Sequence, residues 1–234
     1  MTALRCPRCA DAPALDPARV HTTCPCCKGP LLVEYDLDAA RKTMTKEAVA
    51  VRPADLWRYR ELLPVQDLAN IITLGEGMTP LLPISTLGQT IGLPRLLLKD
   101  EGTGNPTATF KARGAATGVS RARELGITDI AMPTNGNAGG AWAAYCARAK
   151  IRLHLCAPND APPLSMLEAT VVGAAAFYVG PKGLISDAGA IIARGAAEHQ
   201  WFEASTLKEP YRIEGKKTMG FEIAEQLGWR LPGA

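Results

Sequence analysis

The sequence predicts an α/β protein with a doubly wound, mostly parallel sheet, preceded by a small metal-binding segment. Two observations lead to this prediction. Beyond residue 126, short apolar runs alternate with segments of helical length, which is the pattern of successive βαβ units. Nearer the start, five of the seven cysteines lie within 6–27. That clustering favours a metal site in a reducing compartment over a disulfide framework.

The overall composition restricts the class of protein. The chain has 234 residues, of which 47% are hydrophobic and 21% charged, so it is expected to form an ordinary globular core. A net charge of +3 is too small to favour nucleic acid or an anionic membrane as a partner. No apolar run reaches the roughly 18 residues of a membrane span, and Met1–Arg5 leaves no room for a signal peptide. We therefore expect a soluble, cytoplasmic protein.

The cysteine-rich segment, 1–33, has the spacing of a zinc ribbon. Cys6 and Cys9 form one C-x-x-C pair, and Cys24 and Cys27 form a second, with 14 residues between the pairs. Two such pairs can place four thiolates tetrahedrally around one zinc ion. Four cysteines leave no open position, so we expect structural zinc, with Cys26 as the alternative to Cys27 for the fourth ligand.

The connecting segment, 34–78, follows a short strand at 31–35 and is expected to mix helix and loop. It ends in a glycine-rich turn, Gly75-Glu76-Gly77-Met78-Thr79-Pro80-Leu81. A strand is expected at 96–101, in the third region, 79–234, which should hold the α/β fold. That strand leads directly into 105–114, the stretch from which the chemistry of the protein can best be predicted.

The stretch Asn105-Pro106-Thr107-Ala108-Thr109-Phe110-Lys111-Ala112-Arg113-Gly114 begins with a turn dipeptide. After it, small apolar residues recur at helical spacing as far as 122. Lys111 therefore lies in the first turn of a helix, where the helix dipole disfavours a cation. A lysine that is also partly desolvated there loses proton affinity and becomes a usable amine nucleophile.

The rest of the chain alternates regularly between strands and helices. Strands are expected at 127–133, 151–157, 174–179 and 201–204, and helices at 139–149, 164–172, 184–199 and 217–227.

Ligands of such sheets bind beyond the carboxyl ends of the strands. This rule singles out 133–140, which links a strand to the next helix and is rich in small residues. Its backbone N–H groups could approach a carboxylate or a phosphate closely. An ordinary Asn-Gly turn is the alternative interpretation.

Together these motifs resemble the fold-type-II pyridoxal-phosphate (PLP) enzymes, the group of threonine synthase, threonine dehydratase and the tryptophan synthase β subunit. The stretch 105–114 resembles their lysine motif, with Ala108 where glycine is common and Ala112 where aspartate is usual. The turn 75–81 is similar to the Gly-Glu-Gly-x-Thr-Pro-Leu signature of threonine synthases. The resemblance implies the tryptophan synthase β-like fold, in incomplete form.

The resemblance also implies roles for individual residues. Lys111 would form the Schiff base with PLP, and Phe110 would pack near the cofactor. Asn137 would bind the 3′-oxygen of PLP, and Thr134, Gly136 and Ala138 would bind the carboxylate of an amino-acid substrate.

The activity implied is that of a threonine synthase, which converts O-phosphohomoserine and water to threonine and phosphate, with Lys111 also shuttling protons. The alternatives are a threonine dehydratase-like β-eliminating lyase and a non-catalytic truncated remnant. The chain ends directly after a helix and lacks the Gly-Gly-Gly-Thr-Gly-like phosphate loop of the family. We therefore expect a C-terminally truncated fragment, and we allow for a homodimer.

Overall fold

A computed structural model describes residues 1–9 and 12–232, and its centre is a four-stranded parallel sheet. The strands follow the order β7-β6-β5-β8, so β8 lies on the side of β5 opposite to β6. This reversal creates a topological switch point beside the carboxyl end of β5, where α/β sheets bind ligands. The strands are β5 (Asp129–Pro133), β6 (Arg152–Ala157), β7 (Ala175–Tyr178) and β8 (Phe202–Glu203).

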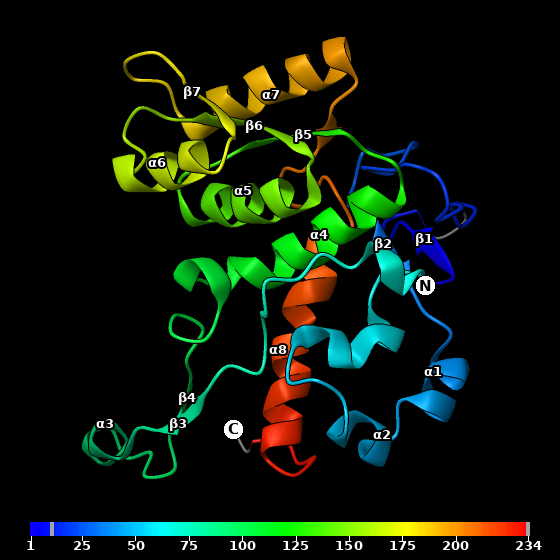
Figure 1. Ribbon diagram of the computed structural model, residues 1–234, viewed down its shortest axis with the longest axis vertical. Helices are drawn as coiled ribbons and strands as arrows, with labels where there is room; N and C mark the ends of the chain where they lie inside the picture. Colours follow the sequence, from blue (N-terminus) through cyan, green and yellow to red (C-terminus); the bar gives the residue numbers. More distant parts are fainter. Residues whose placement is uncertain (10–11, 233–234) are drawn as a thin grey trace.

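Helices cover both faces of this sheet, as doubly wound topology requires (Figure 1). α5 (Asn137–Ala149) and α6 (Pro163–Val171) lie on one face, and α7 (Ile185–His199) lies on the other. Side chains alternate along β5 accordingly. Ile130 and Met132 belong to the core shared with α5, whereas Ala131 packs with residues of α7. The predicted fold class is confirmed.

Two further helices, α4 (Lys111–Glu124) and α8 (Arg212–Gln226), pack against each other beneath α5 (Figure 1). They approach closely because glycines face the opposite backbone at the crossing. A Cβ atom added to Gly215 would overlap the carbonyl oxygen of Arg113, and one added to Gly114 would lie 3.0 Å from the carbonyl oxygen of Arg212. The first turn of α4 is thus held directly against the first turn of α8.

The N-terminal segment packs on the same core. β1 (Ala3–Arg5) pairs antiparallel with β2 (Leu32–Glu34), closing the cysteine-bearing loops between them. Leu4 and Leu31 are buried in the cluster that also contains the alanines of α4. The connecting segment forms α1 (Leu37–Thr43), α2 (Lys46–Ala50) and the 3-10 helices η1 (Leu56–Leu62) and η2 (Leu68–Asn70).

A separate hairpin projects away from the main sheet (Figure 1). β3 (Leu81–Pro83) pairs antiparallel with β4 (Leu97–Lys99), and α3 (Ser85–Thr90) lies between them. The chain then passes through the 3-10 turn η3 (Pro106–Ala108) into α4. The sequence analysis anticipated β4 but missed α3.

One predicted boundary was wrong by five residues. The last helix begins at Arg212 rather than at 217, because Gly215, which resembles a helix breaker in sequence, is the residue that permits the close crossing with α4. In the described part of the chain, no helix combines the length and the apolar character needed to cross a bilayer.

Candidate functional site

Lys111 is the first residue of α4 and is half-buried. Burial lowers the pKa of its amine, and the positive charge of Arg212 lowers it further. Its Nζ atom lies 4.1 Å from the ring centroid of the adjacent Phe110. Among the described residues no carboxylate forms an ion pair with Lys111. The side chain therefore has the reduced proton affinity that the sequence analysis expected of it.

Two more cations lie near Lys111, and we call Lys111, Arg212 and Lys216 the cation cluster. The Nζ atom of Lys216 lies 5.2 Å from the Phe110 centroid. Burial lowers the pKa of Lys216, as do the charges of Lys111 and Arg212. The guanidinium of Arg212 lies 5.0 Å from the Trp142 centroid and donates through Nε to Glu209 at 2.7 Å. Glu209 is thus the carboxylate that offsets part of this charge.

The sequence analysis missed Arg212 and Lys216, because their approach to Lys111 depends on the crossing of α4 and α8. The neighbouring Lys217 is different in character. It pairs with Glu214 and lies 4.0 Å from the Tyr35 ring centroid. Lys217 therefore links α8 to the N-terminal segment and does not belong to the cation cluster.

The loop after β5 is organised by the Thr134 hydroxyl, which is buried. Its oxygen accepts hydrogen bonds from the N–H groups of Gly136 at 3.1 Å and Gly139 at 3.0 Å. Gly136 has a φ of +151°, which disfavours any residue with a side chain. The N–H groups of Asn137 and Ala138 open α5 and donate no hydrogen bond within the described residues. The start of α5 thus offers free donors to an anion or a phenolic oxygen.

Residues 105–110, which lead into Lys111 and which we call the lysine loop, lie beside α5. Thr107 lines one cavity of about 410 Å³ together with Gly140 of α5 and the exposed apolar face of α6. α4 and α5 also pack along their length (Figure 1). The structure therefore places the 3-10 turn that precedes Lys111 against α5, the helix that begins at Asn137.

The lysine loop itself is strained. Thr107 and Ala108 have φ values of +61° and +49°, in the left-handed region that residues with a Cβ atom seldom adopt. The left-handed conformation gives a reason why glycine is common at the position that Ala108 occupies, because glycine enters this region without the steric cost. Such strain persists only where the surrounding contacts enforce it.

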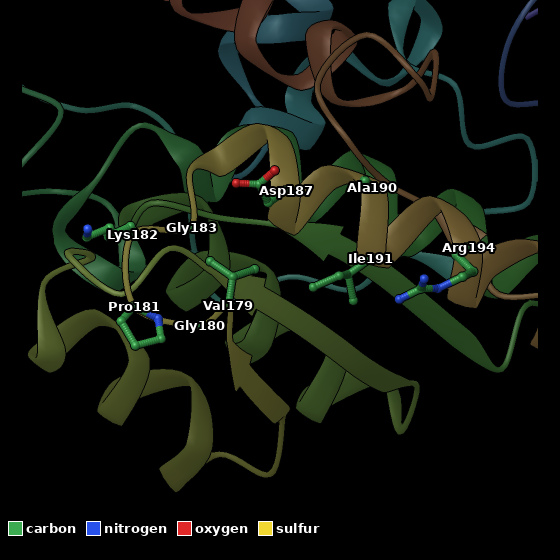
Figure 2. A pocket seen from close by; sticks show the side chains of 9 residues that line it. All are labelled: Val179, Gly180, Pro181, Lys182, Gly183, Asp187, Ala190, Ile191 and Arg194. Carbon is green, nitrogen blue, oxygen red and sulfur yellow. The ribbon is translucent and has the colours of Figure 1, made fainter.

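A larger cavity, of about 570 Å³, lies elsewhere, between the carboxyl end of β7 and α7 (Figure 2). None of the predicted site residues lines it. Its two cationic side chains, Lys182 and Arg194, lie at opposite ends, and Asp187 caps α7 by accepting from the N–H of Leu184 at 2.7 Å. Because its charged groups do not converge, we assign this cavity no chemistry.

The four predicted metal ligands are brought together. The sulfur atoms of Cys6, Cys9, Cys24 and Cys27 all lie within 4.8 Å of one another. The Cys6–Cys27 and Cys9–Cys24 sulfur distances are 3.6 and 4.0 Å. Zn–S bonds of about 2.3 Å in a tetrahedron require about 3.8 Å, so the spacing suits zinc. Cys26, the alternative ligand, is exposed and lies outside the group.

Comparison with known proteins supplies independent information. Residues 72–234 match the family model described as pyridoxal-phosphate dependent enzyme. The threonine synthase of Methanocaldococcus jannaschii is 35% identical over 229 residues, which cover 97% of this chain and 55% of that protein. The threonine synthase of Methanosarcina acetivorans is also 35% identical, over 98% of this chain and 54% of that protein. The chain thus spans about half the length of these relatives.

Solved structures share the fold at lower identity. Maize serine racemase has a TM-score of 0.59 and 19% identity, over 84% of this chain and 51% of that one. Diaminopropionate ammonia lyase from Escherichia coli has a TM-score of 0.59 and 18% identity, over 67% of this chain and 45% of that one. These similarities support the arrangement of sheet and helices described above.

Proposed function

The chain belongs to the pyridoxal-phosphate dependent enzymes, and from this premise we propose that it acts as a threonine synthase, converting O-phosphohomoserine and water to threonine and phosphate. The two threonine synthases reported above, similar over nearly the whole of this chain, support the choice of reaction. The single observation that favours this substrate over an unphosphorylated one is the cation cluster. Its excess positive charge fits a phosphate ester, which is a dianion near neutral pH.

The residues present fit PLP. The half-buried amine of Lys111 has lowered proton affinity and would hold the cofactor through its aldehyde. Asn137 would contact the 3′-oxygen with its exposed amide side chain, and Phe110, the neighbour of Lys111, would pack near the cofactor. When bound, PLP supplies the electron sink for the carbanion chemistry of the substrate.

The proposed division of labour follows from the donors of the site. The free N–H groups of Asn137 and Ala138, in the loop ordered by Thr134 and Gly136, would bind the substrate carboxylate. Arg212 and Lys216 would hold the phosphate as its C–O bond at the γ-carbon breaks. The Nζ atom of Lys111, once free of the cofactor, would carry protons between the substrate carbons. Water then adds its oxygen at the β-carbon.

The test measures threonine and phosphate after PLP and O-phosphohomoserine are added to the purified chain. Equal amounts of both products, abolished by Lys111→Ala, are expected. Formation of 2-oxobutanoate from threonine, with no reaction of O-phosphohomoserine, would instead identify a dehydratase-like enzyme. PLP bound at Lys111 without turnover of either substrate would support the non-catalytic alternative for this chain.

We also propose that Cys6, Cys9, Cys24 and Cys27 hold one structural zinc ion. Their mutual distances support this assignment, and the ion itself would contribute folding free energy to a segment with little core of its own. None of the seven cysteines forms a disulfide, which supports a reducing location such as the cytoplasm.

A further inference from the structure

Arg113 follows Lys111 by two positions and so points to the opposite side of α4, about 200° around the helix. Its side chain is fully buried, although a buried guanidinium requires complete pairing. The role of this arginine in the lysine motif is not explained by the cation cluster, from which it points away.

Two carboxylates bind Arg113 in bidentate geometry. Glu222 accepts from Nη1 at 2.5 Å and from Nη2 at 2.7 Å. Glu101 accepts from Nε at 2.7 Å and from Nη2 at 2.8 Å. Thr218 and Thr79 accept from the same guanidinium at 3.0 and 3.2 Å. Every N–H group of the fork is therefore used.

The network joins three separate parts of the chain. Thr79 and Glu101 flank the β3–β4 hairpin, and Thr218 and Glu222 lie on α8. Arg113 itself lies on α4. Lys99 adds a second cation, donating to Glu222 at 2.9 Å. Two cations thus face two carboxylates, and the buried charges balance. Burial alone would raise the pKa of Glu222, but Arg113 overcomes this effect and holds that pKa below its usual value.

The network continues into the start of the lysine loop through Asn105. The Asn105 amide donates to Glu101 Oε2 at 2.8 Å, and its Oδ1 accepts from the N–H of Gly77 at 3.2 Å. Asn105 on one side and Arg113 on the other therefore anchor the chain to the same carboxylate, Glu101. Between the two anchors lie the strained Thr107 and Ala108, followed by Lys111.

We propose that the Arg113–Glu101–Glu222 network is a positioning device, which holds the lysine loop in its strained conformation and thereby sets the place of the Lys111 amine. Arg113 is a positioning residue and touches no reacting atom. The proposal rests on the proposed function, because it assigns the network to the placement of the cofactor-bearing lysine. It explains why an arginine rather than a lysine stands at 113, since an ammonium group cannot engage two carboxylates in parallel pairs.

The test is Arg113→Lys, which keeps the charge and removes the fork. PLP is added to the purified chain, the bond to Lys111 is trapped with borohydride, and the modified peptide is quantified by mass spectrometry over time. We expect attachment at Lys111 to slow by about 10- to 100-fold, the range that a displacement of about 1 Å produces. Arg123→Lys, at an exposed arginine on the same helix, is the matched control and should leave the rate unchanged.

Two further variants separate positioning from folding. Ala108→Gly lowers the strain, so adding it to Arg113→Lys should restore part of the attachment rate. Gly220→Ala, which should stabilise α8 without touching the lysine loop, should restore none of it, whereas a purely structural defect would respond to both. If Arg113→Lys does not give a native circular dichroism spectrum, the attachment rate is measured in Glu222→Gln instead. That variant weakens the same ion pair and leaves the arginine side chain unchanged. A folded variant with the wild-type attachment rate would overturn the proposal.

A second readout is independent of the cofactor. Competitive acetylation with trace acetic anhydride compares Lys111 with the exposed Lys150. A changed ratio in Arg113→Lys, but not in Arg123→Lys, would support positioning even if the wild-type chain failed to attach PLP, an outcome that would contradict only the proposed function. An unchanged ratio would count against the network.

Discussion

At the scale of single residues, two residues near Lys111 adopt arrangements that are unfavourable by themselves: the backbone of Ala108 and the side chain of Lys216. Ala108 occupies a left-handed conformation that suits glycine. Lys216 points its ammonium group toward the Phe110 ring beside another lysine, and among the described residues no carboxylate forms an ion pair with it. Both arrangements cost free energy, and both adjoin Lys111. Their persistence indicates that the surrounding contacts enforce them.

Ala108→Gly should stabilise the protein. The left-handed conformation costs a non-glycine residue about 1–2 kcal/mol, and the extra flexibility of glycine in the unfolded chain offsets about 0.5–1 kcal/mol of the gain. We expect the free energy of unfolding to rise by about 0.5 kcal/mol in urea titrations. Ala190→Gly, at an exposed helical position of α7, should lower it by about 1 kcal/mol. Equal losses in both variants would contradict the assigned strain.

Lys216→Gln should shift the pH dependence of PLP attachment. The charge of Lys111 lowers the pKa of Lys216. Because like-charge repulsion is mutual, removing the charge of Lys216 should raise the pKa of Lys111, and a higher pH is then needed to form the neutral amine. The attachment rate, followed by absorbance against pH, should therefore move to the alkaline side. Lys150→Gln, at an exposed lysine at the end of α5, should leave the profile in place. A shift to the acid side would disprove the electrostatic coupling.

At the scale of secondary structure, the crossing of α4 and α8 is the contact that builds the site. It places Arg212 and Lys216 against Lys111, and Glu222 against Arg113. The crossing is possible only because Gly215 carries no side chain. A residue that weakens a helix in isolation thus stabilises the packing of two helices.

Gly215→Ala should therefore be strongly destabilising. Its methyl group would overlap the carbonyl oxygen of Arg113, and separating the helices would break buried contacts, so we expect a loss of about 3 kcal/mol or more in unfolding free energy. Gly220→Ala offers a control on the same helix, because nothing lies within 4 Å of its Cβ position. This second variant should gain up to about 1 kcal/mol. Similar thermal midpoints for the two variants would refute the close crossing.

Much of this arrangement could be predicted from the sequence, because the parallel strands are short apolar runs and the lysine motif is contiguous. The helix α3 was missed since it has only six residues and no side-chain cap. Arg212 and Lys216 were missed for a different reason. Their role arises from a contact between segments about 100 residues apart, which no local pattern encodes.

At the scale of the whole molecule, the N-terminal segment and the α/β region share one core. Leu4, Cys6, Cys24 and Leu31 belong to the same buried cluster as α4. Tyr35 further donates to Glu214 of α8 at 2.6 Å. The domain boundary predicted at residue 33 stays a prediction, and buried side chains from both sides of that boundary pack into one core.

Removal of the proposed zinc ion should for this reason destabilise the entire chain. We expect chelation to lower the midpoint of one cooperative thermal transition, because loss of the cysteine cluster withdraws Leu4 and Leu31 from the common core. Cys27→Ser should lose the metal, measured by atomic absorption, while Cys26→Ser should keep it, since Cys26 lies outside the cluster. A transition that does not respond to chelation would contradict this coupling.

The separation of Arg113 from Glu222 has a consequence for biosynthesis. Glu222 follows Arg113 by 109 residues, so the ribosome exposes the lysine motif long before its counter-charges on α8 exist. Contacts of such sequence separation form late and slowly. Until α8 emerges, Lys111 lacks the neighbouring charge of Arg212, which together with burial lowers the pKa of its amine in the folded chain. The lysine thus reaches its final electrostatic environment only when the two helices cross, and not when its own motif has been synthesised.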